Sequence, residues 1–150
     1  MVSLTLGDGT STAAPVKRAA QWWVETVTTR TELADPVTAW DDLAWHALEP
    51  NPFYEAIMFL PAWDRFAAEG PTEIALVYRN GVRPQDPPEL CGFFPFARER
   101  HGPIQLRTLW KHIYCFLCTP LVRQGVAVET LRTLCEWLEQ DRQGPAVWQL

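Results

Sequence analysis

Hydrophobic residues follow a strand-type pattern in several short segments of the chain. Residues 21–30 are rich in β-branched and aromatic types, which favour strands. The other strand-like segments are residues 73–79, 90–98, 105–118 and 146–150. Pro95 lies inside one of them and suggests an edge strand or a bulge, because proline has no N–H to donate. The pattern predicts five strands.

Apolar residues at helical spacing occupy the region between the first two strands. Asp35-Pro36 is typical of a helix start, with Asp as the N-cap and Pro at the first helical position. Asn51-Pro52 repeats this signal, and the stripe that follows it is Phe53, Ile57 and Leu60. Pro61 would break or kink that second helix. Residues 36–69 are therefore expected to form two or three short helices.

The clearest helical pattern follows Gly125 and ends before Gly144-Pro145. Its apolar face is predicted to contain Val128, Leu131, Leu134, Cys135 and Leu138. Three consecutive strands with short links imply antiparallel pairing, and a last strand reached through this helix can lie parallel to its neighbour. We expect an α+β fold (α/β in some schemes), with a mixed, mainly antiparallel sheet flanked by helices.

The length and composition predict one globular domain. The chain has 150 residues, of which 47% are hydrophobic. Residues 1–20 are small and polar and are expected to form a flexible leader on a domain of residues 21–150. Their order of charge is the reverse of a secretory signal, so we expect a cytoplasmic protein. No apolar stretch approaches the ~20 residues of a membrane span. The net charge of −5 argues against nucleic acid as a partner.

The four cysteines include a Cys115-x-x-Cys118 pair that invites a zinc or redox interpretation. On a regular strand these two side chains would point to opposite faces. No second Cys-x-x-Cys or His pair completes a metal site. The sequence therefore favours buried free thiols and no metal.

Residues 110–118 contain the most informative chemistry. On a regular strand, Trp110, His112 and Tyr114 would share one face and could line a groove that binds a substrate. His112 could then act as a general base. The alternative is a histidine and a tyrosine that are satisfied at the edge of a core. Catalytic residues stay unassigned, because no Gly-x-Ser-x-Gly nucleophile motif and no Walker or Rossmann glycine loop occurs.

Several short motifs, in this order, resemble the acetyltransferase-like proteins of bacterial cellulose and polysaccharide biosynthesis, which belong to the GNAT (acyl-CoA N-acyltransferase) superfamily. The motifs are Trp40-Asp41-Asp42-Leu43, Asn51-Pro52-Phe53, Pro61-Ala62-Trp63, Leu90-Cys91-Gly92-Phe93-Phe94-Pro95-Phe96, Trp110-Lys111-His112-Ile113-Tyr114 and Leu117-Cys118-Thr119-Pro120-Leu121-Val122. The resemblance covers about residues 21–150.

The resemblance implies a GNAT-like fold and acyl transfer from acetyl-CoA or another acyl-CoA to an amine, in polysaccharide or cell-envelope biosynthesis. It also implies that these residues are the N-terminal part of a longer chain, with a second GNAT-like domain as partner. One departure concerns the donor. GNAT domains hold the coenzyme A pyrophosphate with Arg/Gln-x-x-Gly-x-Gly/Ala, whereas the two Arg-Gln-Gly stretches here, at Gly125 and Gly144, are one residue short. The alternative is a non-catalytic GNAT-like module that packs on a partner domain or binds glycan.

Overall fold

The computed structural model describes residues 21–66, 71, 73–81, 83, 85–140 and 147–149. The predicted leader and the predicted helix stop at Gly144-Pro145 lie outside these residues. The elements in chain order are β1 (Trp22–Val27), η1 (Glu32–Ala34), α1 (Val37–Trp45), η2 (Pro52–Tyr54), α2 (Ala56–Arg65), β2 (Glu73–Arg79), β3 (Glu89–His101), β4 (Ile104–Leu109), β5 (Leu121–Val122), α3 (Ala127–Gln140) and β6 (Val147–Gln149).

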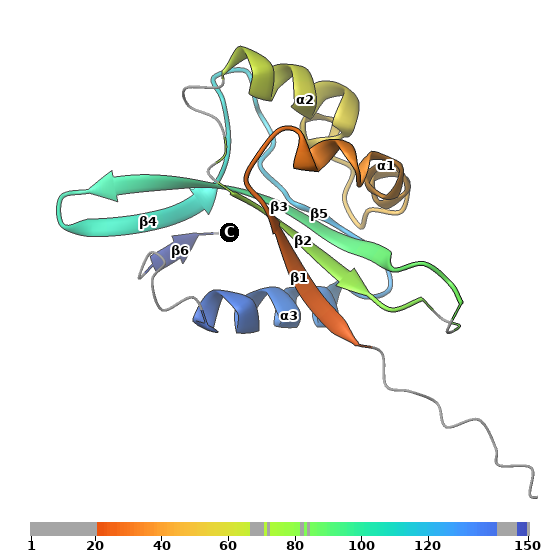
Figure 1. Ribbon diagram of the computed structural model, residues 1–150. Coiled ribbons are helices and arrows are strands. Elements are labelled where there is room, and N and C mark those ends of the chain that lie inside the picture. Colours follow the sequence, from red (N-terminus) through yellow and green to blue (C-terminus); the bar gives the residue numbers. More distant parts are fainter. Residues whose placement is uncertain are drawn as a thin grey trace, which may run out of the picture.

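The described strands form one mixed sheet in the order β1-β2-β3-β4-β6, and β5 also pairs with β3 (Figure 1). Every pairing is antiparallel except that of β4 with β6, which is parallel and is reached through α3. The predicted fold class, a mixed and mainly antiparallel sheet with helices, is therefore confirmed. The parallel last strand, Val147–Gln149, is confirmed as well.

The helices cover both faces of the sheet (Figure 1). Phe93 faces α1 and α2, where its ring stacks on Trp40 at 4.3 Å. The next residue, Phe94, faces α3 and packs in a second core with Leu134 and Leu138. This alternation follows from the strand geometry, because successive side chains point to opposite faces. β3 thus contributes to both cores.

The structure changes three details of the predicted helices. α1 begins at Val37 with Pro36 as its N-cap, so Asp35 does not cap it. Pro61 lies inside α2 without ending it. The carbonyl that Pro61 leaves without an N–H donor is that of Ile57, whose side chain is 78% exposed, so water can reach this part of the helix. The predicted stripe with Ile57 is therefore wrong, and the buried residues of α2 are Ala56, Phe59 and Trp63.

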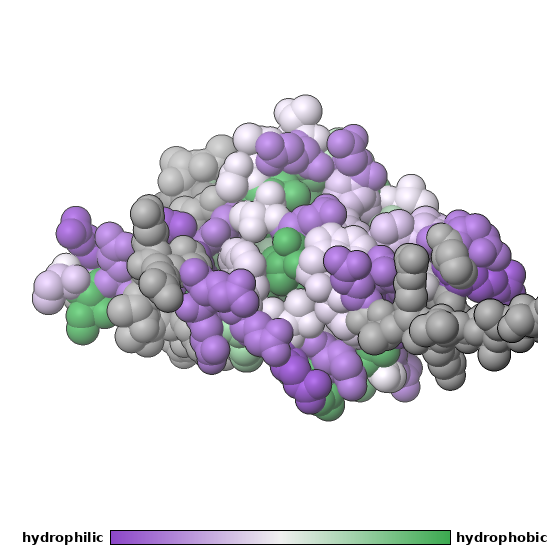
Figure 2. All heavy atoms as spheres, turned by 60° about the horizontal axis from the view of Figure 1, so that its bottom comes forward, coloured by the Kyte–Doolittle hydropathy of each residue, from purple (hydrophilic) through white to green (hydrophobic). Residues whose placement is uncertain are grey.

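The apolar face predicted for α3 is right at Leu134 and Leu138 and wrong at Val128, which is 65% exposed. Thr130 takes a buried position instead, and its hydroxyl donates to the carbonyl of Val126, so the polar atom is satisfied. Figure 2 brings this side of the molecule forward and shows hydrophilic residues interspersed with hydrophobic ones. None of the described helices has the length and apolar content needed to cross a bilayer.

Pro95 marks a change of neighbour within β3. On one side β3 pairs with β2 from Glu89 to Phe96. On the other side its residues Gly92 and Phe93 pair with β5, whereas Phe96–His101 pair with β4. The bulge opposite Val77/Tyr78 leaves Cys91 as the extra residue, so Pro95 is neither at an edge strand nor at the bulge. Pro95, which has no N–H, therefore lies between the part of β3 that pairs with β5 and the part that pairs with β4.

Candidate functional site

The segment 110–120 does not continue the fourth strand. β4 ends at Leu109, and the prediction of a regular strand over 105–118 is wrong beyond that residue. The reason lies at Trp110, whose N–H donates to the carbonyl of Pro95 at 2.8 Å. Pro95 has no N–H to return, and the carbonyl of Trp110 instead accepts a hydrogen bond from the Tyr54 hydroxyl at 2.6 Å. The ladder therefore stops here.

The three residues predicted to share a strand face are brought together by a turn instead. His112 stacks on Phe66 with ring centroids 4.9 Å apart, and Tyr114 contacts the same Phe66 ring at 6.1 Å. Trp110 contacts His112 at 5.5 Å. Phe66 directly follows α2 and carried no sequence signal for this contact, which depends on how the helix packs beside the turn.

The three predicted site residues differ in exposure. Trp110 is 3% exposed and packs edge-on against Phe59, so it supports the segment from below. His112 is half-buried, and Tyr114 is 62% exposed. Only His112 and Tyr114 therefore offer surface to a ligand.

The His112 ring is held in a defined state. Its Nδ1 accepts a hydrogen bond from the Tyr114 N–H at 3.3 Å, which leaves the proton of the neutral ring on Nε2. Burial lowers the pKa of His112 below its ordinary value of 6.5. At neutral pH Nε2 of this ring is thus a hydrogen-bond donor, and the acceptor lone pair on Nδ1 is already used. This arrangement suits ligand orientation better than the general-base role considered from the sequence.

A cavity of about 580 Å³ lies beside the same segment. Its walls come from the β3–β4 hairpin and from the segment 110–120, and its lining residues are Glu99, Thr108, Leu109, Lys111, Phe116, Leu117, Cys118, Thr119 and Pro120. The parallel pairing of β4 with β6 is described up to Thr108, and Thr108 and Leu109 at the end of β4 line the cavity. Lys111 lines the cavity, whereas its neighbour His112 packs on Phe66.

Two opposite charges line this cavity. The Glu99 carboxylate accepts a hydrogen bond from the Thr108 hydroxyl at 3.2 Å, and Lys111 is exposed. The remaining walls are mostly apolar, with Phe116 83% exposed. Glu99 was not identified as a candidate site residue from the sequence. The antiparallel register pairs Glu99 with Leu106 and Ala97 with Thr108, so Glu99 and Thr108 are diagonal neighbours, and no local sequence pattern indicates this contact.

Asn51 anchors the far end of the segment. It is fully buried, and its Nδ2 donates to the carbonyl of Thr119 at 2.7 Å and to that of Leu117 at 3.3 Å. Its Oδ1 accepts the Phe53 N–H at 3.0 Å, so the predicted capping role is confirmed, although the first helix it caps is the 3₁₀ helix η2. With Tyr54 on Trp110, η2 holds both ends of the segment that walls the cavity.

Cys115 and Cys118 are free thiols, as predicted, but they are half-buried and not buried, and the strand argument that separated them is wrong because no strand is present. Burial raises the pKa of Cys115, and the nearby Cys118 raises it further. The Cys115 thiol donates to the carbonyl of Leu117 at 2.9 Å. Among the described residues no group of three or more His, Cys, Asp or Glu side chains could hold a metal ion.

The loop before α3 contains the first of the two Arg-Gln-Gly stretches. Gly125 has a left-handed φ of +82° and opens the turn. The neighbouring Arg123 is buried, and its guanidinium donates to the carbonyl of Leu90 and forms ion pairs with Asp42 and Glu89. The charge of Arg123 is therefore compensated by ion pairs within the protein.

A scan of protein-family models and searches of curated proteins and of solved structures gave no match to this chain.

Proposed function

We propose that this chain is a GNAT-like domain that forms the acceptor side of an acyl transfer from acyl-CoA to an amine. The observation that carries the proposal is the cavity of about 580 Å³ at the end of β4. It combines an apolar wall, which suits an acyl chain, with one carboxylate and one ammonium group. This is the combination of groups that amine acylation uses.

Each polar group in the cavity has a role in this chemistry. An amine must lose a proton as it becomes acylated, and the Glu99 carboxylate can accept that proton. The Lys111 ammonium can stabilise the negative charge that develops on a carbonyl oxygen. Phe116 and Leu117 supply the apolar wall beside these polar groups. His112 and Tyr114 would contact the outer part of an acceptor.

The loop before α3 does not fit the pyrophosphate of coenzyme A. Arg123 is already paired with Asp42 and Glu89, and Glu129 in the first turn of α3 would repel an anion. We therefore propose that a second GNAT-like unit holds the donor phosphates and packs near the exposed Ile113 and Phe116. Dependence on acyl-CoA would place the reaction in the cytoplasm.

The test is acetyl-CoA turnover by the protein expressed from its complete reading frame. Release of free coenzyme A thiol is followed with glucosamine and with lysine as acceptors. We expect amine-dependent release, and we expect Glu99→Gln, which keeps the shape of the side chain, to lower kcat/KM for the amine by about 100-fold. Glu136→Gln on the exposed face of α3 is the matched control and should leave the rate unchanged. Absence of both acetyl-CoA binding and thiol release would rule out the proposal, and wild-type rates in Glu99→Gln would rule out the role of that residue.

A second candidate function, glycan binding without catalysis, is favoured by the aromatic surface of Phe66, His112 and Tyr114. The apolar faces of sugar rings pack on such surfaces, and Nε2 of His112 can donate to a hydroxyl group. A glycan array probed with the wild-type protein and with Tyr114→Ala would distinguish the two functions. Binding that Tyr114→Ala abolishes supports this candidate, and the absence of any bound glycan contradicts it.

A further inference from the structure

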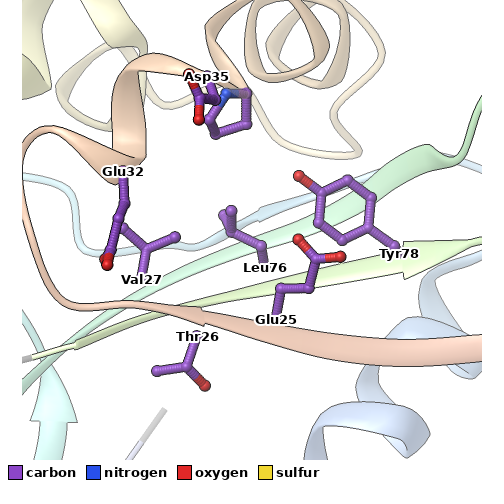
Figure 3. Close-up of a pocket in the computed structure, with 8 residues that line it drawn as sticks. Glu25, Thr26, Val27, Glu32, Asp35, Leu76 and Tyr78 are labelled. Carbon is purple, nitrogen blue, oxygen red and sulfur yellow. The ribbon is translucent and has the colours of Figure 1, made fainter.

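A second cavity, of about 380 Å³, lies between the end of β1, the turn that leads to α1, and β2. Three of its lining residues are acidic, Glu25, Glu32 and Asp35, and Tyr78 from β2 completes the polar wall (Figure 3). Its lining residues include no lysine, arginine or histidine. The cavity is therefore a concentrated negative site on the side of the sheet that carries α1 and α2.

Two of the carboxylates are held in place by neighbouring groups. Trp23 donates from Nε1 to Oε1 of Glu25 at 2.9 Å, which leaves the second oxygen of Glu25 available. The backbone N–H groups of Thr28 and Thr29 donate to Oε2 of Glu32 at 3.0 and 3.2 Å. These hydrogen bonds lower the pKa of Glu32, so it is ionised at neutral pH. The first two anions of the site are thus preorganised.

Asp35 is available for a ligand because it does not cap a helix. The sequence predicted Asp35 as the N-cap of α1, yet Pro36 takes that position. Within the described residues, the Asp35 carboxylate has no hydrogen-bond or ion-pair partner. An unpaired carboxylate at the wall of a cavity favours a positively charged ligand.

Tyr78 is the independent sign of a ligand. It is only 9% exposed, and Trp23 stacks on its ring with a centroid distance of 5.7 Å. Figure 3 shows its hydroxyl directed into the space between Asp35 and Glu25. Within the described residues, this hydroxyl has no hydrogen-bond partner. The Tyr78 side chain is buried except where its hydroxyl meets the cavity, so a ligand in the cavity can supply the hydrogen-bond partner that the protein does not.

The carboxylates are arranged for an extended cation and not for a metal ion. They line one cavity, but they do not converge into a group that could hold a metal. Separate ammonium groups on one flexible chain match separate carboxylates, and the volume falls in the range of small-molecule sites. We propose that this cavity binds a small aliphatic polyamine, whose ammonium groups pair with Glu25, Glu32 and Asp35 and donate to the Tyr78 hydroxyl. This inference does not depend on the proposed acyl transfer.

The test is calorimetric titration of the full chain with spermidine. We expect saturable binding at one site, with an affinity that falls about tenfold in Glu25→Gln and in Asp35→Asn. Tyr78→Phe keeps the ring stack with Trp23 and should weaken binding several-fold. Glu136→Gln removes the same charge from a distant exposed position on α3 and serves as the matched control.

Each outcome decides the proposal. Loss of affinity in the cavity variants with full affinity in Glu136→Gln supports it. An equal loss of spermidine affinity in Glu136→Gln would show that spermidine is attracted only by the net charge of the protein, and this would overturn the proposal. The absence of any binding would also overturn the proposal. Butylamine, with a single ammonium group, should bind at least tenfold more weakly than spermidine. Equal affinity for butylamine, or equal competition by Mg²⁺, would overturn the match to spaced carboxylates. Circular dichroism of each variant confirms that an altered affinity is not loss of fold.

Discussion

The side-chain amide of Asn51 donates a hydrogen bond to the carbonyl of Thr119 at 2.7 Å, across 68 positions of the sequence. The same side chain accepts the N–H of Phe53, so one buried amide joins a helix start to the irregular segment that walls the larger cavity. Asn51 thus has a local role and a long-range role. A substitution can separate them.

Asn51→Asp keeps the acceptor for Phe53 and removes the donor to Thr119 and Leu117. If Asn51 only capped η2, this change would be nearly neutral, because Asn and Asp are equally good caps. We expect instead a loss of at least about 2 kcal/mol in the free energy of unfolding, since two carbonyls lose their donor and face a carboxylate at a buried position. Urea denaturation measures this loss. The exposed Asn80→Asp is the control, and a neutral Asn51→Asp would contradict the anchoring role.

Tyr54→Phe removes only the hydroxyl that donates to the carbonyl of Trp110. Burial raises the pKa of Tyr54 above its ordinary value, so the hydroxyl stays protonated and remains a donor. Its loss removes the hydrogen bond that this carbonyl accepts, at the point where the β4 ladder has already ended. We expect a cost of about 1–2 kcal/mol in urea denaturation. Tyr114→Phe, at an exposed tyrosine, should stay within about 0.5 kcal/mol of the wild type. Equal stability of the two variants would contradict this account.

Gly92 brings β3 close to α3. A Cβ at this position would lie 2.5 Å from Cε2 of Phe94 and 2.8 Å from Cγ2 of Thr130. Gly92→Ala should therefore destabilise the protein by about 1–3 kcal/mol through overpacking. Thr130→Ser removes one of the two contacts, so the double variant should lose less stability than the sum of the single variants. Additive losses in thermal or urea unfolding would show that α3 does not press on Gly92.

His112 should titrate below 6.5, because burial lowers its pKa. The folded state then binds this proton less tightly than the unfolded state, so protonation of the unfolded chain favours unfolding as the pH falls below 6.5. Nuclear magnetic resonance of the ring Cε1–H signal against pH measures the midpoint. Phe66→Ala uncovers the ring and should move the midpoint up toward 6.5. A midpoint that Phe66→Ala leaves unchanged would show that stacking on Phe66 does not shield His112.

Much of the fold could be predicted from local patterns. The strand 73–79 and the helix after Gly125 were found, as was the parallel last strand, because strand periodicity, caps and chain connectivity are local or nearly local properties. The end of β4 could not be found in this way. It depends on Pro95 of the neighbouring strand β3. Proline has no N–H, so it cannot donate the next ladder hydrogen bond to the carbonyl of Trp110. The sequence of residues 105–118 carries no sign of that absence.

The candidate sites divide in the same way. The sequence by itself determined that Trp110, His112 and Tyr114 form an unusual polar and aromatic group, since residue types and spacing are visible in one segment. Only the tertiary structure decided that Phe66 gathers His112 and Tyr114 around one ring, and that Glu25, Glu32, Asp35 and Tyr78 line one cavity. The physical reason is that strand register and helix packing bring together residues that are far apart in the chain. The free energy of those contacts cannot be predicted from the local sequence pattern.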